Sequence, residues 1–236
     1  MKLTGAIFDL DGTLTQHKTP LEESARETLA ALGQNARLCM VGAGMCRRVF
    51  EQMNHFPIDI IGNYGMQVAR VNNGVLETVA DYSVPVDRES IEKRVTFLRE
   101  KFGYCDFKGE NVEYHTSGCI TIPLLGTAAE QKDKLLFDPT REKRRRIYGF
   151  VKELFPDYTV FVGGTSSFDM APKPFNKYYA LDKYCAEKGI SHSETVYAGD
   201  DYGPGGNDES VFLSDFNFVK IDDYRDFPEK MKEYIK

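Results

Sequence analysis

The chain has 236 residues, of which 42% are hydrophobic, and its formal net charge is −6. This composition predicts a globular protein with a sizeable core, as one large or two small domains. The acidic balance argues against a nucleic-acid partner, and no apolar segment is long enough to cross a bilayer. Five cysteines, an odd number without a CxxC pair, favour a reducing cytoplasm over a disulfide framework. We therefore expect a cytoplasmic protein.

The first third of the chain alternates predicted strands with predicted helices. Short apolar runs predict buried strands, at residues 3–8, 37–41 and 58–61. Helices are predicted between them, over about 20–32 and 46–53. Thr19, Pro20 and Glu22 form a capping-box pattern before the first helix, and Gly33 marks its end. This alternation indicates βαβ units and a mostly parallel sheet.

The middle of the chain has a different rhythm. Asn72-Asn73-Gly74 predicts the turn of a hairpin between residues 67–71 and 75–79. Helices and strands then follow in an order typical of an α+β unit, with helices near 90–102 and 140–155 and strands near 111–114, 119–125, 159–162 and 167–171. The basic run 143–146 lies inside a helical pattern, and we interpret it as a solvated helix face.

After Pro172-Lys173-Pro174 the parallel rhythm resumes, with a helix over residues 177–188 and a strand over 195–198. The predicted architecture is therefore an α/β, Rossmann-like doubly wound core, made of residues 1–83 and 175–236. Residues 84–174 form an inserted α+β cap domain that sets substrate specificity. Such a sheet binds ligands beyond the carboxyl ends of its strands, and an inserted domain hinged there can act as a lid.

Carboxylates gather at those strand ends. In GAIFDLDGTLT, a predicted strand runs directly into Asp9 and Asp11, and Asp200 follows the last predicted strand. Clustered carboxylates need a cation, and Mg²⁺ accepts several carboxylates with water and a phosphate group. A carboxylate can also act as a nucleophile and form an aspartyl-phosphate, while Lys177 neutralises the phosphoryl oxygens. A turn or helix-capping pattern remains the alternative for Asp9 and Asp11 alone.

Glycine-rich stretches allow backbone amides to approach a phosphate, at Gly12-Thr13, Gly42-Ala43-Gly44 and Gly205-Gly206. Motifs of three other kinds of site are absent from the sequence: nucleotide-phosphate, calcium and serine-nucleophile sites. There is no Walker A pattern, no EF-hand ligand ladder and no Gly-x-Ser-x-Gly nucleophile elbow.

Phe8-Asp9-Leu10-Asp11-Gly12-Thr13 resembles the first motif of the haloacid dehalogenase-like (HAD) phosphotransferase superfamily. Lys177 resembles the third motif, and Gly199-Asp200-Asp201 resembles the fourth. Three further stretches resemble the eukaryotic-type phosphomannomutase branch, which carries a type IIB inserted cap: residues 41–44, 163–169 and 204–208. The similarity extends over essentially the whole chain.

The resemblance implies a role for each matched residue. Asp9 is implied as the nucleophile, Asp11 as the general acid and base, and Lys177 as their catalytic partner. The implied magnesium ligands and their supports are Asp9, Asp200, the backbone carbonyl of Asp11, Asn207 and Asp208. The implied substrate-binding residues are Gly42, Ala43, Gly44, Lys18, Lys134, Ser167 and Asp169. The resemblance also implies a possible homodimer formed through the cap.

Several positions depart from the pattern of the branch. Its cap arginines, which grip the phosphate remote from the chemistry, are replaced by His115 and Thr127, and a third corresponds loosely to Lys134 or Lys132. A core arginine is replaced by Lys18. The second motif, residues 41–45, lacks the usual Ser or Thr hydroxyl. Because lysine does not reproduce bidentate phosphate binding, a weakened remote grip favours hydrolysis over mutase turnover.

The sequence thus predicts a magnesium-dependent phosphatase that acts on a small phosphorylated sugar or polyol, with neither a nucleic-acid nor a membrane partner. A phosphohexomutase is the alternative, supported by Ser167, Asp169 and the loop 204–208. A catalytically silent sugar-phosphate-binding protein is a third possibility, motivated by the missing hydroxyl of the second motif.

Overall fold

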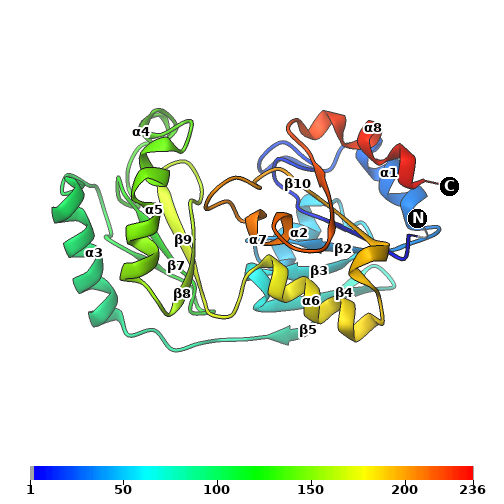
Figure 1. Cartoon of the computed structure of the whole chain (residues 1–236), viewed down its shortest axis with the longest axis horizontal. Coiled ribbons are helices and arrows are strands. Elements are labelled where there is room, and N and C mark those ends of the chain that lie inside the picture. Colours follow the sequence, from blue (N-terminus) through cyan, green and yellow to red (C-terminus); the bar gives the residue numbers. More distant parts are fainter. Residues whose placement is uncertain (1–2, 236) are drawn as a thin grey trace. The chain divides into compact units, whose positions relative to one another are not determined.

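In the computed structural model, which describes residues 3–235, the chain forms two compact units. The first unit comprises the chain up to Tyr82, Asn176–Gly203 and the chain from Asp208 onward. The second comprises Ser83–Phe175 and Pro204–Asn207. In Figure 1 the blue and red ends of the chain thus belong to one unit, and the green middle forms the other.

A seven-stranded sheet forms the centre of the first unit, in the order β11-β10-β1-β2-β3-β4-β5. Its strands are β1 (Gly5–Phe8), β2 (Arg37–Val41), β3 (Asp59–Gly62), β4 (Gln67–Asn72), β5 (Val75–Asp81), β10 (Thr195–Gly199) and β11 (Asn217–Lys220). The first five strands of that order pair in parallel, and β4 and β5 form an antiparallel hairpin. Asn73 and Gly74 have positive φ angles of 50° and 77°, as the predicted Asn-Gly turn requires.

Helices cover both faces of this sheet, because successive strand residues point to opposite sides. The helices are α1 (Glu23–Leu32), α2 (Cys46–Gln52), α6 (Lys177–Lys188), α7 (Glu209–Phe212) and α8 (Phe227–Met231). Phe8 and Met40 face a core shared with α1, α2 and α8. Ile7 and Cys39 face the opposite core, shared with α6 and α7. The predicted α/β doubly wound architecture is confirmed.

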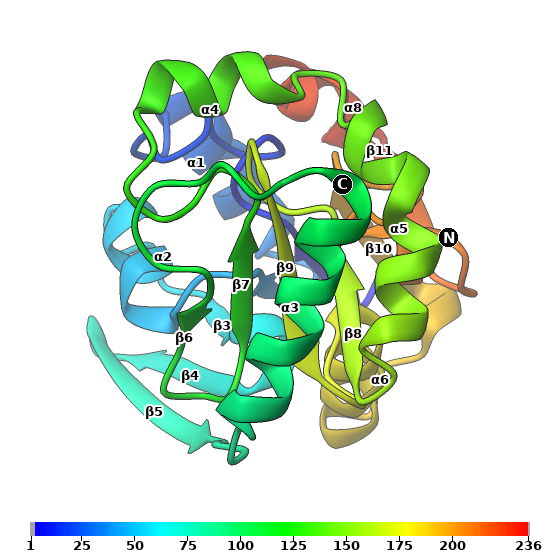
Figure 2. The ribbon, with the colours of Figure 1, turned by 90° about the vertical axis from the view of Figure 1, so that its left-hand side faces the viewer.

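The second unit has a four-stranded antiparallel sheet in the order β6-β7-β9-β8. Its elements are α3 (Arg88–Phe102), β6 (Glu113–Tyr114), β7 (Ile120–Pro123), α4 (Gln131–Phe137), α5 (Glu142–Leu154), β8 (Tyr158–Phe161) and β9 (Ser167–Pro172). Figure 2 shows α3 and α5 in front of these strands. Val95 of α3 and Val151 of α5 are fully buried in the core that the two helices share with Phe168 of β9.

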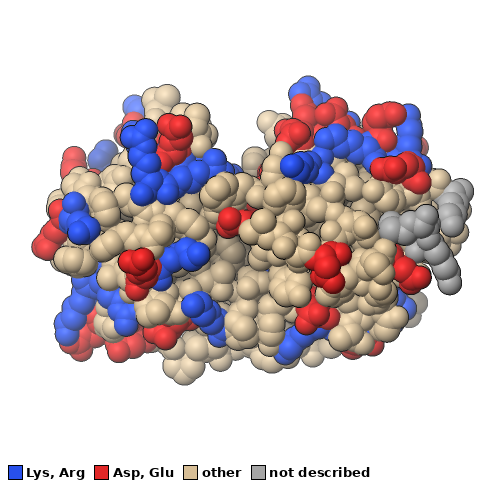
Figure 3. Space-filling model, in the orientation of Figure 1, with Lys and Arg blue, Asp and Glu red and all other residues tan. Residues whose placement is uncertain are grey.

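Short 3₁₀ turns complete the chain, at Asn63–Gly65, His192–Glu194, Tyr224–Asp226 and Lys232–Tyr234. Within the described residues, no helix combines the length and apolarity needed to cross a membrane. On the face drawn in Figure 3, lysines and arginines are interspersed with acidic side chains.

The predicted capping box of the first helix is wrong. α1 begins at Glu23, and Glu22 makes no side-chain capping hydrogen bond. Thr19 instead donates its hydroxyl to the carbonyl of Gln16 (2.8 Å). Glu22 still has extended backbone angles, and the buried Leu21 before it donates its N–H to the carbonyl of Gln52 (2.9 Å). Tertiary contact therefore overrides the local capping signal.

The basic run of α5 is not uniformly solvated as predicted. Lys143 and Arg146 are exposed, but Arg144 is completely buried and pairs with Asp138 (3.0 Å). The residues next to Arg144 in the sequence do not indicate its burial, because its partner Asp138 lies six residues earlier in the chain. The helix α4 was also missed, and it has no buried residue from which an apolar pattern could arise.

Candidate active site

The first unit brings three sequence-distant positions to one edge of its sheet. β1, β2 and β10 are neighbours, with Phe8 beside both Met40 and Ala198. Because these strands are parallel, the residues that follow their ends meet at the same edge. Asp9 and Asp200 follow β1 and β10 directly, and Gly42 follows β2.

Three carboxylates converge at this edge. Asp9, Asp200 and Asp208 each offer one oxygen, and these oxygens lie within 4.8 Å of one another. Asp9 and Asp208 are buried, at 6% and 0% exposed. Asp200 approaches closely because Gly12, with φ of 102°, has no side chain: a Cβ there would stand 2.5 Å from an Asp200 oxygen. Thr13 donates its hydroxyl to the same carboxylate (2.9 Å).

Lys177 is the cationic partner of this group. It is the first residue of α6, where the side chain of Asn176 caps the helix by accepting the N–H of Tyr179 (2.9 Å). The ammonium is completely buried and donates to Asp9 and Asp208, both at 2.6 Å. Burial alone lowers the pKa of Lys177, but the two carboxylates outweigh it and raise the pKa above its ordinary value. Lys177 therefore stays charged.

The charges of the site do not balance. Three carboxylates, two of them buried, face one ammonium, which leaves a formal surplus of two negative charges. Burial raises the pKa of Asp9 well above its usual range despite Lys177, and the neighbouring carboxylates raise it further. Burial and Asp208 likewise raise the pKa of Asp200. A hard divalent cation with a preference for oxygen ligands fits both the charge and the donor set.

Asp208 is fixed by its own set of donors. Besides Lys177, the buried phenol of Tyr197 donates to one of its oxygens, and the backbone N–H of Asp201 donates to the other (3.0 Å). These bonds orient the carboxylate in the group. The Tyr197 side chain lies on the face of the sheet that α6 covers, where Lys177 also lies. The apolar pattern of β10 alone does not predict this hydrogen bond to Asp208.

Asp11 does not belong to the three-carboxylate group but has a separate set of partners. One oxygen accepts from the Gln52 side-chain amide (2.7 Å) and from the backbone N–H of Lys18 (2.7 Å), and the other pairs with Arg48 (3.1 Å). Burial raises the pKa of Asp11, but these donors outweigh it and hold the pKa below its ordinary value. Asp11 is therefore ionised at neutral pH.

The glycine loop after β2 borders Asp9. A Cβ on Gly42 would stand 3.9 Å from the Oδ1 atom of Asp9. The N–H of Gly42 already donates to the carbonyl of Ile61 (2.9 Å), so it is engaged within the sheet. Phosphate binding by Ala43 and Gly44 remains a prediction.

The structure places the other predicted residues as follows. Lys18 is exposed, and its backbone rather than its side chain bonds Asp11. In the second unit, Ser167 donates to the carbonyl of Gly163 (3.2 Å) and Lys134 donates to that of Thr127 (3.1 Å). Asp169 accepts from Thr121 (2.9 Å), and burial raises the pKa of Asp169. Their contacts with a substrate remain predictions.

Asn207 lies in a segment that packs with the second unit. There the carbonyls of Gly205 and Pro204 accept from the N–H of Val162 (2.8 Å) and from Arg145 (3.2 Å). The three-carboxylate group is defined without Asn207, so its part in a metal site is also still a prediction.

The sequence reasoning missed Arg48, Gln52 and Tyr197. Arg48 and Gln52 are four residues apart on α2 and hence share a helix face. The sequence contained a signal for Arg48 and Gln52, because the helix that carries them follows the strand next to β1. Two polar residues one turn apart on that helix can reach the residues that follow β1, which include Asp11.

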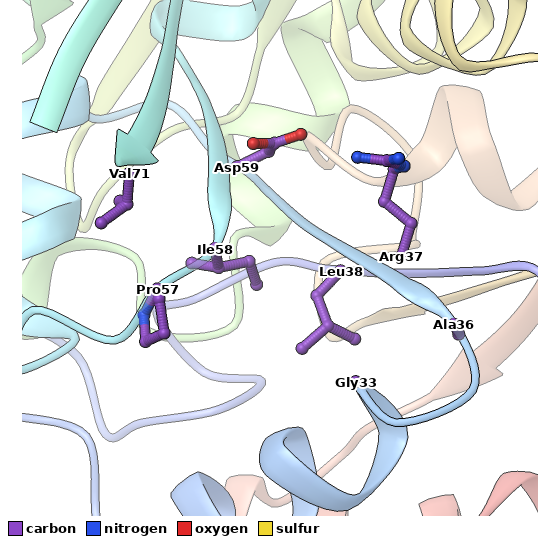
Figure 4. A pocket seen from close by; sticks show the side chains of 8 residues that line it. All are labelled: Gly33, Ala36, Arg37, Leu38, Pro57, Ile58, Asp59 and Val71. Atoms are coloured by element: carbon purple, nitrogen blue, oxygen red, sulfur yellow. The ribbon is translucent and has the colours of Figure 1, made fainter. Parts of the chain in front are cut away.

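A hollow of about 230 Å³ lies elsewhere on the first unit, and Figure 4 shows its lining. Arg37 and Asp59 border it, and they are the first residues of β2 and β3. It therefore opens at the amino ends of the strands, whereas the carboxylates follow the carboxyl ends. We assign it no part in the chemistry.

The fold and the site define a phosphotransferase-type enzyme with a carboxylate centre. The sequence profile of the haloacid dehalogenase-like hydrolases matches residues 6–212. The chain belongs to this family, and is a HAD-type phosphatase or phosphotransferase.

Curated relatives resemble the chain over nearly its whole length. A phosphomannomutase of Saccharomyces cerevisiae is 26% identical over 90% of this chain and 86% of the relative. A phosphomannomutase of Encephalitozoon cuniculi is 25% identical over 98% and 93%. The resemblance to the phosphomannomutase-like branch is thereby confirmed.

Solved structures share the fold at low sequence identity. A HAD subclass IIB sugar phosphatase matches with a TM-score of 0.64 and 17% identity, covering 98% of each chain. The IMP-bound IMP-nucleotidase of Plasmodium falciparum matches with a TM-score of 0.72 and 14% identity, covering 98% of this chain and 68% of that one. These structures support the fold alone.

Proposed function

We propose that the protein is a magnesium-dependent phosphatase that releases phosphate from a small phosphorylated sugar or polyol. The observation that carries the proposal is the buried Asp9 carboxylate. It is held by Lys177 at 2.6 Å inside a three-carboxylate group that keeps two surplus negative charges. No packing requirement explains such a surplus, whereas a divalent cation that offsets it, and that would also bind a phosphate group, does.

In the proposed first step, an oxygen of Asp9 attacks phosphorus and the bond from phosphorus to the ester oxygen breaks. Asp11 gives a proton to the departing oxygen. The bonds from Gln52 and Arg48 keep Asp11 ionised in the free protein, but a bound phosphate dianion raises its pKa through like-charge repulsion. In the second step, Asp11 takes a proton from water, and that water displaces phosphate from Asp9.

Asp9, Asp200 and Asp208 are the side chains that would hold Mg²⁺, with the backbone carbonyl of Asp11. When bound, the ion supplies charge stabilisation for the transferring phosphoryl group. Lys177 acts beside it by neutralising one of the carboxylates that face the phosphoryl oxygens.

Hydrolysis is favoured over a mutase reaction by the chemistry of the second unit. A mutase must also bind the phosphate remote from the reacting centre, for which arginine is best suited. Two arginines of this unit, Arg99 and Arg144, are buried and donate to protein groups, so they are not available for such a phosphate. Thr127 instead accepts the N–H of Glu110 (2.9 Å), which is a local structural contact. We therefore assign the second unit the selection of a monophosphorylated substrate.

A phosphohexomutase is the second candidate, and the curated relatives favour it. Both reported relatives are phosphomannomutases, and they match most of their own length. Ser167 and Asp169 are the residues of the second unit that would bind sugar hydroxyls in either reaction.

The test is a screen of phosphorylated sugars and polyols with Mg²⁺, run with and without a hexose bisphosphate. The screen measures both free phosphate and phosphosugar isomers. Asp9→Asn, which keeps the size of the side chain, is the blank for contaminating phosphatases. Free phosphate from wild type alone supports the phosphatase.

Each other result decides between the candidates. Interconversion of 1- and 6-phosphates that needs the bisphosphate establishes the mutase and rejects the phosphatase. A substrate that raises the melting temperature without turnover rejects both, and indicates a binding protein.

A further inference from the structure

The loop of the second motif lacks a hydroxyl, and an arginine fills the space beside it. A Cβ added to Gly44 would stand 2.3 Å from Nη2 and 2.6 Å from Nε of Arg48. The guanidinium therefore lies directly over the Cα atom of Gly44. A serine or threonine at this position cannot coexist with Arg48 in its observed place. The lack of a side chain at Gly44 and the place of the Arg48 guanidinium are thus two parts of one arrangement.

The guanidinium is held in this place by specific bonds. Arg48 donates to the side-chain oxygen of Gln52 (2.6 Å) and to Asp11 (3.1 Å). Gln52 in turn donates to Asp11 (2.7 Å) and to the hydroxyl of Thr15 (3.1 Å). A guanidinium has five N–H donors, and the Arg48 side chain is 44% exposed, so it can also bind a ligand.

This guanidinium lies beside the loop that borders the nucleophile. A Cβ on Gly42 would stand 3.9 Å both from Asp9 Oδ1 and from the backbone nitrogen of Gly44. One loop thus adjoins Asp9 at Gly42 and Arg48 at Gly44. A phosphoryl group attached to Asp9 would be bordered by the same loop.

We propose that Arg48 binds an oxygen of the transferring phosphoryl group in place of the missing Ser or Thr hydroxyl, and that with Gln52 it positions Asp11. The inference rests on the proposed function. It replaces a neutral donor by a charged one, and charge-assisted hydrogen bonds are the stronger kind. It also removes the reason for expecting a catalytically silent protein, because Arg48 substitutes for the missing hydroxyl.

The neighbouring residue of α2 provides a matched control. The Arg47 side chain is 74% exposed, and it forms a long ion pair with Glu51, at 3.8 Å. Both ion pairs are partly exposed, and such pairs contribute little to stability. Arg48→Met and Arg47→Met should therefore unfold at similar temperatures, and any difference between them reports on the site.

The experiment measures turnover of p-nitrophenyl phosphate with Mg²⁺ and the binding of orthovanadate, which imitates the transferring phosphoryl group. Arg48→Met should lower kcat by about 100- to 1,000-fold, the usual effect of removing one oxyanion donor. Vanadate binding should weaken at least about tenfold, guanidinium salt should restore part of the rate, and Arg48→Lys should fall between. Arg47→Met should match wild type.

A second variant exploits the space at Gly44. Gly44→Ser displaces Arg48 and should also lower kcat, while Gly44→Ser combined with Arg48→Met should be more active than Arg48→Met alone. Equal kcat and vanadate affinity in Arg48→Met and Arg47→Met overturn the proposal. So does a loss of activity in Arg48→Met that parallels unfolding and shows no guanidinium rescue.

The proposed function can fail separately. If wild type hydrolyses no phosphate ester, the phosphatase is rejected, while the vanadate comparison between Arg48→Met and Arg47→Met still decides the role of Arg48.

Discussion

Each unit of the protein buries a cation that pairs with carboxylate, but the two do so in opposite ways. In the second unit, Arg144 faces one carboxylate, Asp138, and donates to the carbonyls of Gly163 and Ser167 as well. In the first unit, Lys177 faces two carboxylates directly and a third close by. The charge of Arg144 is balanced within the protein, whereas the carboxylates around Lys177 keep a surplus of negative charge.

This difference separates structural from functional charge. Asp138 also accepts the backbone N–H groups of Lys143 and Arg144, both at 3.0 Å, and so caps the start of α5. Its pKa is lowered, because these bonds outweigh the effect of burial. The pKa of Asp9 is raised. A buried carboxylate that is satisfied by protein stabilises the fold, whereas one with surplus charge is available for a ligand.

The largest expected effect is on turnover. Asp9→Asn removes the nucleophile and should lower kcat by at least about 10⁴-fold. Because it also removes surplus buried charge, the metal-free variant should melt no lower than wild type. Calorimetry and initial rates on the same preparation check both parts. A variant that is inactive and also strongly destabilised would show that the charge of Asp9 supports the fold.

Asp138→Asn should behave in the opposite way. It leaves Arg144 buried without its ionic partner, which costs about 3–5 kcal/mol of unfolding free energy. Magnesium affinity of the folded protein should be unchanged, as measured by titration calorimetry below the melting range. Asp133→Asn, on the adjacent helix α4, is the control. Loss of magnesium binding in folded Asp138→Asn would contradict the comparison.

Magnesium and protons should compete for the surplus charge. In metal-free protein the raised pKa values of Asp9 and Asp200 mean that the native state binds more protons than the unfolded state. Stability should therefore rise as the pH falls through these raised pKa values, and stop rising near the unfolded value of about 3.9.

Saturating Mg²⁺ should remove this pH dependence near neutrality. It should add about 2.7 kcal/mol at one hundred times its dissociation constant. Denaturant unfolding at several pH values, with Mg²⁺ or a chelator, measures both effects, and Asp200→Asn should show each of them weakened. Identical curves with and without the metal would remove the basis for the magnesium site.

The smallest expected effect belongs to the second unit. Ser167→Ala should raise the KM for the best sugar phosphate by about two- to tenfold, the equivalent of one hydrogen bond, and leave kcat nearly unchanged. The control is Thr116→Ala, which removes an exposed hydroxyl from the same unit. If the two variants have equal KM values, Ser167 has only its structural bond to Gly163.

Much of the fold was predictable because its signals are local. Apolar runs gave the parallel strands, and the positive φ angles of Asn73 and Gly74 follow from the residue types. The capping pattern at Thr19 failed because the contact of Leu21 with Gln52 is not local. Arg144 was misread for the same reason, since its burial depends on a carboxylate before the helix and on carbonyls after it.

The sequence by itself determined the chemical class of this protein. The first motif, Lys177 and Asp200 suffice for that through their resemblance to the HAD superfamily, because motifs are local patterns of residue types. Only the tertiary structure decided how those charges are shared. It placed Asp208 where both Lys177 and Tyr197 donate to it, and Arg48 over Gly44. The bonds of Lys177 to Asp208 and of Arg48 to Asp11 join residues distant in the chain, and no local pattern encodes their distances.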